Sequence, residues 1–365
     1  RPFLADPEIV NKSETNRSDE INTCIGCNQA CLDHIFKRKV ATCLVNPRAS
    51  HEGTWPLLAR ALNPRRVAVV GSGPAGLSAA MEAARLGHHV ELFEESAMIG
   101  GQFNLAKTIP GKEEFHETLR YFQRMLSKLQ VKVHLNRHVS ADDLSSQFDS
   151  VILATGIRPR SWNIPGLKGQ GISVGYTAVL KNEITVGTRV AIIGAGGIGF
   201  DVADYLTHDG DASFSNAWGI DHDLSSRGGL VKPGSRTSKR EVHLFQRSSG
   251  KVGGRLGKTT GWIHRKTLKD RGVQTHSNVE YQKWDDGWLY FTEDDIPQKI
   301  KIDHVVVCVG QEERNELVEA IRETGMDVHT VGGALNSRGL DAQRAIREGL
   351  EAAYDLSPWK VNQES

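Results

Sequence analysis

Four of the five cysteines lie in one short stretch near the start of this 365-residue chain. Cys24, Cys27, Cys31 and Cys43 have the spacing C-x2-C-x3-C-x11-C. Four thiolates this close in sequence can hold either a structural zinc ion or an iron–sulfur cluster. Zinc ribbons usually use two separate CxxC pairs, whereas this stretch has one. The spacing therefore favours an iron–sulfur cluster, with structural zinc as the alternative.

A glycine-rich turn between an apolar strand and a helix is the second feature that could do chemistry. Residues 71–76 read Gly-Ser-Gly-Pro-Ala-Gly, which is the GxGxxG fingerprint. In this fingerprint Gly71 makes the tight turn, Gly73 lets the backbone approach a pyrophosphate, and Gly76 allows close packing of helix on strand. The N–H groups at the start of the helix then face the anion. The turn predicts a dinucleotide site.

Residues further along the chain complete this first site and indicate FAD. Glu94 ends the next strand, 23 residues after Gly71, where a carboxylate accepts hydrogen bonds from ribose hydroxyls. Gly101 and Gln102 follow in a turn that would lie near the dinucleotide. A buried strand then ends in Ala-Thr-Gly at Gly156. Together these features resemble the two-dinucleotide flavoproteins of the glutathione-reductase-like group, in which such a strand closes the FAD domain.

The same fingerprint occurs a second time, with a different residue at the ribose position. Gly194, Gly196 and Gly199 repeat the glycine spacing after an apolar strand. At the end of the following strand, Gln246 and Arg247 occupy the place that Glu94 has in the first site. A carboxylate there would repel a 2′-phosphate, whereas an arginine can pair with it. The second nucleotide is therefore predicted to be NADPH.

The order of these elements predicts the fold and the domains. Strands alternate with helices, which indicates parallel α/β sheets. We predict an α/β fold with two Rossmann-like dinucleotide-binding domains, preceded by an irregular iron–sulfur segment. The expected boundaries are 1–62 for that segment, 63–160 for the first part of the FAD domain, 161–309 for the NADP domain and 310–365 for the return to the FAD domain. A polar insertion at 209–239 is expected to form a surface excursion or lid.

Composition excludes some partners and indicates a compartment. Lys plus Arg (45) nearly equals Asp plus Glu (44), which gives no reason to expect nucleic acid or a charged membrane surface as a partner. The apolar runs are far shorter than the ~20 residues of a membrane helix. No export signal is visible, and clustered thiols suit a reducing compartment, so a cytoplasmic location is expected. Cys308 stands in an apolar strand and is predicted to be a core residue.

Longer motifs resemble the bacterial NADPH-dependent 2,4-dienoyl-CoA reductases over essentially the whole chain. The motifs are Asn22–Cys31 (NTCIGCNQAC), Gly100–Lys112 (GGQFNLAKTIPGK), Gly194–Asp201 (GAGGIGFD) and Gly257–Arg265 (GKTTGWIHR). Members of that family carry an N-terminal barrel that holds FMN and the acyl-CoA site. The start of this chain resembles the tail of such a barrel, so the chain is expected to be a piece of a longer protein.

This resemblance implies an electron path and assigns residues to it. Electrons would pass from NADPH through FAD and a [4Fe–4S] cluster to FMN in the missing barrel, and then to 2,4-dienoyl-CoA in unsaturated fatty acid β-oxidation. Dienoyl-CoA would meet this chain only through the barrel. The backbone of Val139 would touch the adenine of FAD, and no catalytic acid or base is expected in this chain. The implied ligands of the cluster are Cys24, Cys27, Cys31 and Cys43.

Two other functions fit the same residues. The chain could be an NADPH oxidoreductase subunit for a different acceptor, although relatives of that kind carry a second cysteine cluster that is absent from this sequence. It could also be a non-enzymatic nucleotide-binding scaffold with a zinc knuckle. Iron analysis separates the scaffold from both enzymes.

Overall fold

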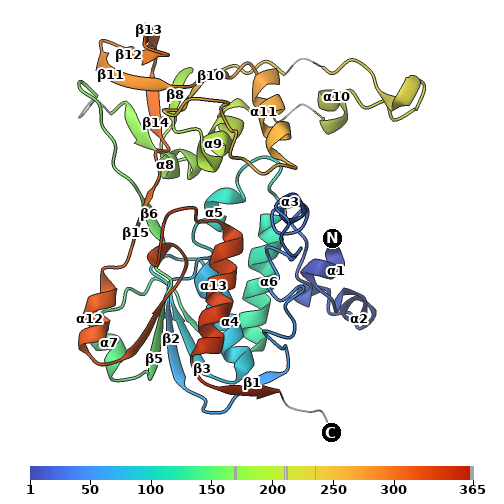
Figure 1. Cartoon of the computed structure of the whole chain (residues 1–365), viewed down its shortest axis with the longest axis vertical. Coiled ribbons are helices and arrows are strands. Elements are labelled where there is room, and N and C mark those ends of the chain that lie inside the picture. Colours follow the sequence, from blue (N-terminus) through green and yellow to red (C-terminus); the bar gives the residue numbers. More distant parts are fainter. Residues whose placement is uncertain (168–170, 209, 211–212, 235, 362–365) are drawn as a thin grey trace. The chain divides into compact units, whose positions relative to one another are not determined.

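The computed structural model describes all residues except 168–170, 209, 211–212, 235 and 362–365. The described residues form two compact units. Residues 1–107, 111–158 and 311–365 make up the first unit, and residues 108–110 and 159–310 make up the second. The chain therefore leaves the first unit near Arg158 and returns to it at Gln311 (Figure 1).

A five-stranded parallel sheet in the order β16-β5-β2-β3-β4 forms the centre of the first unit. Its strands are β2 (Arg66–Val70), β3 (His89–Phe93), β4 (Lys132–His134), β5 (Ser150–Leu153) and β16 (Asp327–Thr330). The helices of this part of the chain are α4 (Pro74–Leu86), α5 (Phe103–Ala106), α6 (Phe115–Lys128), α7 (Ala141–Ser145), α12 (Leu317–Glu323), η3 (Gly332–Ala334) and α13 (Ala342–Asp355).

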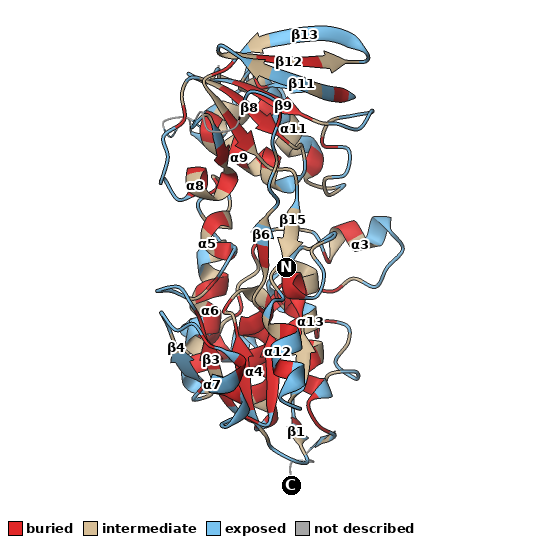
Figure 2. Cartoon of the chain, turned by 90° about the vertical axis from the view of Figure 1, so that its left-hand side faces the viewer, coloured by how far each residue is buried: buried red, intermediate tan, exposed pale blue. Residues whose placement is uncertain are grey.

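Both faces of this sheet are covered, which explains why its strands are continuous apolar runs (Figure 2). Helices α4, α6 and α13 contribute to the core on one face, and α7 and α12 to the core on the other. Helix α13 lies very close to α4. A Cβ at Gly349 would overlap the carbonyl oxygen of Ala75, and Ser78 Oγ–H donates to the carbonyl of Ile346 at 2.7 Å. The helix that carries the first glycine turn is thus fixed against α13.

The cysteine-bearing segment packs onto this unit. Its elements are short: α1 (Pro2–Ala5), α2 (Ile9–Glu14), η1 (Ser18–Glu20), α3 (Leu32–Phe36) and β1 (Ala59–Ala61). Strand β1 pairs in an antiparallel manner with β17 (Trp359–Val361). The segment is therefore largely irregular, as predicted, but it contains short helices that the sequence analysis did not place.

A buried ion pair joins the cysteine-bearing segment to α4. Arg48 donates from Nη1 to Glu82 Oε1 at 2.8 Å and from Nη2 to Glu82 Oε2. The same guanidinium donates to the Tyr354 hydroxyl at 3.2 Å, and Arg85 Nη1 lies 3.3 Å from Glu82 Oε1. Burial alone would raise the pKa of Glu82, but the charges of Arg48 and Arg85 outweigh it and lower that pKa.

Replacing Glu82 with glutamine is expected to destabilise the first unit by about 3–5 kcal/mol, because two buried cations would lose their counter-charge. The free energy of unfolding in urea measures this. Since the folded-state pKa is lowered, the carboxylate's contribution is present at neutral pH and is lost as the pH falls below about 4. Glu319→Gln is the matched control, because its ion pair with Arg322 is exposed and is worth about 0–1 kcal/mol. Equal losses in both variants would contradict the expectation.

The second unit repeats the parallel α/β arrangement. Its parallel sheet has the order β10-β9-β8-β14-β7. Its strands are β7 (Ser173–Gly175), β8 (Arg189–Ile193), β9 (Glu241–Phe245), β10 (Gln274–His276) and β14 (His304–Val307). A three-stranded antiparallel sheet consists of β11 (Val279–Asp285), β12 (Trp288–Glu293) and β13 (Ile296–Lys301). The helices are α8 (Tyr176–Leu180), α9 (Gly197–Thr207), α10 (Phe214–Trp218), η2 (Arg227–Gly229) and α11 (Gly261–Asp270).

The short strands β6 (Ile157–Pro159) and β15 (Gln311–Glu313), which pair with each other, lie where the chain passes between the units.

The predicted fold class is confirmed, and the structure adds two details. Cys308 lies just after β14, which ends at Val307, and is half-buried. The insertion at 209–239 contains α10, η2 and a bridge between Ile220 and Leu230 where it is described, so it has secondary structure of its own.

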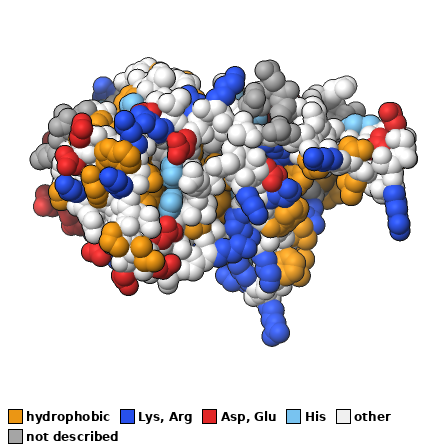
Figure 3. Space-filling view, turned by 90° about the horizontal axis from the view of Figure 1, so that it is seen from above, with side chains coloured by type: hydrophobic (Ala, Val, Ile, Leu, Met, Phe, Trp, Pro, Cys, Tyr) orange, Lys and Arg blue, Asp and Glu red, His pale blue; other side chains and the backbone are white. Residues whose placement is uncertain are grey.

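The surface carries charges of both signs. On the face drawn in Figure 3, Lys and Arg side chains gather next to hydrophobic side chains on one part, and Asp and Glu side chains are more frequent on another. Among the described helices, none has both the length and the apolar character needed to cross a membrane.

Candidate dinucleotide sites and cysteine pocket

The first glycine turn connects β2 to α4 and fits closely against the neighbouring strand. Gly71 has a φ of +99°, and a Cβ there would overlap the carbonyl oxygen of Ala154, just after β5. A Cβ at Gly76 would overlap the carbonyl oxygen of Gly71. At Gly73, by contrast, a Cβ would meet open space. The first and third glycines are therefore required by packing, and the second leaves the backbone accessible, as a pyrophosphate needs.

Glu94 lies beside this turn and is held by backbone and hydroxyl donors. Its Oε2 accepts from the N–H and the hydroxyl of Ser72, at 2.8 and 2.7 Å, and its Oε1 accepts from the N–H of Ser96 at 2.8 Å. The carboxylate is buried and retains lone pairs for further donors. The sequence analysis missed Ser72, whose position inside the GxGxxG turn is the only signal for it.

The Gly100–Gln102 turn reaches back to the glycine turn. The N–H of Gly100 donates to the carbonyl of Ser72 at 2.9 Å. A Cβ at Gly101 would lie 2.9 Å from Cα of Gly73, so only glycine fits at this approach. Gln102 is exposed and precedes α5. The structure therefore brings together Glu94, Gly101 and the glycine turn, which the sequence predicted to share one site.

The C-terminal Gly332–Gly333 turn closes the same site. A Cβ at Gly332 would lie 2.9 Å from Cβ of Ala75, and one at Gly333 would lie 3.0 Å from the backbone of Gly156. Glu348 of α13 accepts from the N–H of Gly332 at 2.7 Å. The sequence analysis missed Glu348, which orients this turn. Its position on the helix that follows the two glycines was the available signal.

Val139 lies apart from these turns in the core on the other face of the sheet. Its side chain is buried beside Phe93 and Phe148. Only its backbone could therefore meet a ligand, which is the kind of contact that the resemblance implied. That contact stays a prediction.

The second glycine turn has the same construction in the second unit. A Cβ at Gly194 would overlap the carbonyl oxygen of Cys308, and a Cβ at Gly199 would overlap that of Gly194. Gly196 again faces open space. Cys308 thus occupies the position that Ala154 has in the first unit, which explains why its backbone, and not its thiol, is in close contact with the turn.

Arg247 follows β9 and is exposed, close enough to Tyr281 for its charge to act on the phenol. The side chain of Gln246 turns back toward its own loop, where its amide donates to the carbonyl of Ser248 at 3.0 Å. Arg240, just before β9, donates to the carbonyl of Leu206 at the end of α9 at 3.0 Å. Arg247 is therefore the cation available beside the second turn on this strand.

The four clustered cysteines line a single pocket in the first unit. Leu4, Ile25, Ala30, Thr42, Leu44 and Val45 contribute to its walls. Burial and the neighbouring thiols raise the pKa of Cys27 to about 11, and burial likewise raises the pKa of Cys43. Without a cation in the pocket these thiols would stay protonated at neutral pH, whereas a metal centre would hold them as thiolates.

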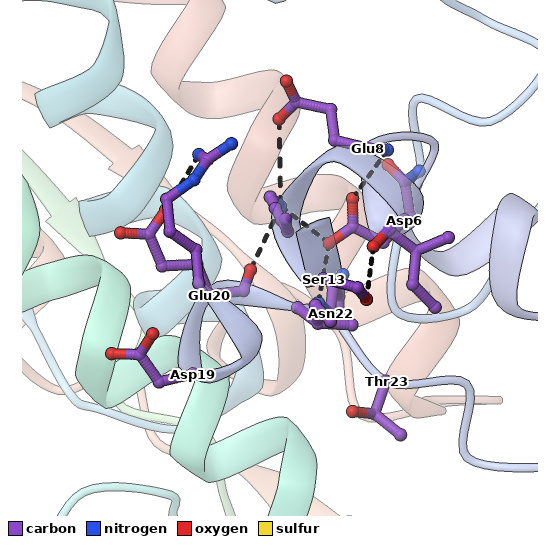
Figure 4. A network of polar contacts seen from close by, with 12 residues as sticks. Asp6, Glu8, Ser13, Asp19, Glu20, Asn22 and Thr23 are labelled. Atoms are coloured by element: carbon purple, nitrogen blue, oxygen red, sulfur yellow. Dashed lines mark hydrogen bonds and ion pairs between the residues drawn. The ribbon is translucent and has the colours of Figure 1, made fainter. Parts of the chain in front are cut away.

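A buried polar network fixes both ends of the cysteine segment (Figure 4). Asp6 Oδ2 accepts from the ammonium of Lys12 at 2.7 Å and from the N–H of Asn22 at 2.8 Å. The side-chain amide of Asn22 donates to the carbonyl of Val45 at 2.8 Å. Asn22 precedes Cys24 by two residues, and Val45 follows Cys43 by two. The side-chain amide of Asn22 therefore joins the two cysteine-bearing segments.

Helix α6 also holds this segment in place. Lys128 Nζ lies 2.7 Å from Glu20 Oε2, and Arg124 Nε lies 2.6 Å from Asp19 Oδ2. Arg120 donates to the carbonyl of Ile21 at 2.8 Å. The pocket is therefore built on the same rigid scaffold as the first glycine turn. Within the described part of the chain, no group of three or more His, Cys, Asp or Glu residues is arranged to hold a metal ion.

The chain belongs to the pyridine nucleotide-disulphide oxidoreductase family, which it matches over residues 65–338. That family implies FAD and a nicotinamide nucleotide as cofactors of an oxidoreductase, in agreement with the two glycine turns. The thioredoxin reductase of Lactococcus lactis has a similar fold, with a TM-score of 0.56 at 21% identity over 80% of this chain and 97% of its own.

Longer relatives match nearly the whole chain. A metal reductase of Desulforamulus reducens is 28% identical over 97% of this chain and 52% of its own length. An NADH oxidase of Thermoanaerobacter brockii is 30% identical over 98% of this chain and 51% of its own. A solved 2-naphthoyl-CoA reductase in complex with 2-naphthoyl-CoA superposes with a TM-score of 0.83 at 25% identity, over 98% of this chain and 50% of its own. The chain thus spans about half the length of the relatives it matches.

Proposed function

We propose that the chain is the NADPH-oxidising part of a cytoplasmic reductase, in which FAD and a [4Fe–4S] cluster supply electrons to an FMN-containing barrel. The barrel would reduce 2,4-dienoyl-CoA in fatty acid β-oxidation. The observation that carries the proposal is that Cys24, Cys27, Cys31 and Cys43 line one pocket in the unit that also holds the first dinucleotide turn. The likeness to a reductase that binds an acyl-CoA supports the substrate class.

Each cofactor has residues that fit it. The first turn, with Glu94 and Gly101, would hold FAD, and the second turn, with Arg247, would hold NADPH. When bound, FAD takes up a hydride as an electron pair, and an iron–sulfur cluster takes up single electrons. The chain itself contributes binding, orientation and electrostatics, since no titratable side chain at the two turns needs to act as an acid or base.

An anaerobic titration with NADPH, followed by visible absorbance, tests the proposal, with NADH run in parallel and iron and sulfide measured beforehand. Bleaching of the flavin followed by loss of the broad cluster absorbance, at much lower NADPH than NADH, is the expected result. Flavin that neither nucleotide bleaches would overturn hydride transfer. Zinc without iron in a colourless preparation would favour the nucleotide-binding scaffold.

The surface beside the pocket supports the proposed exit of electrons. Residues 35–40, between Cys31 and Cys43, are all exposed and read Ile-Phe-Lys-Arg-Lys-Val. Exposed apolar side chains flanking three cations are typical of a docking surface for a partner with an acidic rim. The proposed acceptor domain would dock here.

Reversing three charges on this surface is expected to change the choice of electron acceptor. With Lys37, Arg38 and Lys39 replaced by glutamate, NADPH-driven reduction of anionic ferricyanide should slow roughly tenfold at low salt. Reduction of cationic hexaamminecobalt(III) should not slow, because its repulsion by the surface is removed. Stopped-flow absorbance measures both rates. The control reverses Lys299 and Lys301 on exposed β13; equal slowing by both variants would place the electron exit elsewhere.

A further inference from the structure

Four titratable side chains form a hydrogen-bonded chain from β9 through β10 to β12 in the second unit. His243 Nδ1 and His276 Nε2 are 3.0 Å apart. At the two ends, His243 Nε2 lies 3.1 Å from Glu241 Oε1, and His276 Nδ1 lies 2.8 Å from Glu293 Oε2. The ring of His276 is also stacked on Phe245, with 4.6 Å between the centroids. None of these residues belongs to the dinucleotide fingerprints.

The number of ring protons that these three hydrogen bonds need follows from the groups at the two ends. Both ends are carboxylates, which only accept hydrogen bonds. Three hydrogen bonds therefore need three ring protons, and two neutral imidazoles supply two. The chain is complete only when it takes up one proton from solvent. His243 is buried, and burial lowers its pKa. The other ring, that of His276, has Glu293 as its second partner.

His276 is connected to the turn that carries Arg247. The carbonyl of His276 accepts from the N–H of Gln246 at 2.8 Å. Two residues further on, the N–H of Asn278 donates to the carbonyl of Ser248 at 3.1 Å. The backbone is thus fixed on both sides of Arg247, while the guanidinium itself stays exposed.

We infer that His276, held by His243 and Glu293, is a positioning residue for Arg247 and thereby for the 2′-phosphate of NADPH. The inference rests on the proposed function, which assigns the second turn to NADPH. The charged groups that face the two rings are Glu241 and Glu293, and Arg189 of β8 acts on Glu241. Completion of the hydrogen-bonded chain at lower pH keeps the turn in place, so the positioning weakens as the pH rises.

Calorimetric binding of NADPH and NADH to the purified chain tests the inference, with the ratio of the two Kd values as the readout. His276→Gln is expected to lower the preference for NADPH roughly three- to tenfold, which is a usual size for coupling between neighbouring residues. As the pH rises, the preference for NADPH should fall more in the wild type than in this variant. Ionisation of the 2′-phosphate affects both proteins equally, so it cancels in this comparison. Glu293→Gln should act in the same direction. His116→Gln, at an exposed position of α6, should change nothing.

A double-mutant cycle with Arg247→Ala separates positioning from a general effect on the fold. If His276 acts through Arg247, adding His276→Gln to Arg247→Ala leaves the Kd ratio unchanged. The inference would be overturned by a further fall in the NADPH preference of the double variant, or by an unchanged preference in both His276→Gln and Glu293→Gln. In either case, NADPH binding by the wild type would still support the proposed function. A wild type without any preference for NADPH would overturn the NADPH assignment and the inference together.

Discussion

Replacing Cys27 with serine is expected to remove bound iron and sulfide and the broad visible absorbance of the cluster, while FAD stays bound and NADPH still bleaches it. The serine hydroxyl is a poor ligand for iron, which is held by thiolates in such clusters. Loss of a supporting outer-shell group already costs about 10–100-fold in metal affinity, so loss of a ligand should cost more. Electron transfer from NADPH to ferricyanide should fall by at least about tenfold.

Cys308→Ser is the matched control for this variant, because Cys308 lies in the other unit, outside the pocket. Its iron content should equal that of the wild type. The two readouts of the Cys27 variant distinguish the possible failures. Retained iron would show that Cys27 is not a ligand, and zinc in the wild type would show that the pocket holds a structural metal. Loss of both iron and FAD would show that the pocket supports the fold of the whole unit.

The predicted sites depended on local patterns, and these patterns were sufficient for the two glycine turns. At both turns the first glycine is enforced by overlap with a backbone carbonyl from a distant part of the chain, and the third by overlap with the carbonyl of the first glycine. The sequence predicts this because the fingerprint already encodes the packing of strand, turn and helix. The fold class followed from the same alternation of strands and helices.

Contacts between residues far apart in sequence were not predictable in this way. Glu348 orients the Gly332 turn although it belongs to no motif. Asn22 opens the Asn22–Cys31 motif, but the motif does not reveal its hydrogen bond to Val45, which joins the two cysteine-bearing segments. Arg240 is a further example. It lies just before β9, near the second turn, and it donates a hydrogen bond to the carbonyl of Leu206 at the end of α9. A charged residue near a site has several possible partners, and only the tertiary structure decides among them.

The two glycine turns differ most at the residues that follow the next strand, and this difference makes Arg247 the strongest test of the proposed NADPH selectivity. Glu94 offers carboxylate oxygens held by Ser72 and Ser96, whereas the second site offers an exposed guanidinium. Replacing Arg247 with alanine should weaken NADPH binding by about 1.5–3 kcal/mol, or roughly 10- to 150-fold in Kd, because a hydrogen bond between charged groups is lost. NADH, which lacks the phosphate, should bind with little change.

Calorimetry with both nucleotides at several salt concentrations measures this loss. Because Arg247 is exposed, added salt should reduce the wild-type preference for NADPH and have little effect on the preference of the variant. Arg255→Ala is the matched control, since Arg255 is an exposed arginine on the loop that follows. A larger loss from Arg255 than from Arg247 would move the phosphate contact to that loop. Equal weakening of NADPH and NADH by Arg247→Ala would mean that the arginine supports the turn and does not recognise the phosphate.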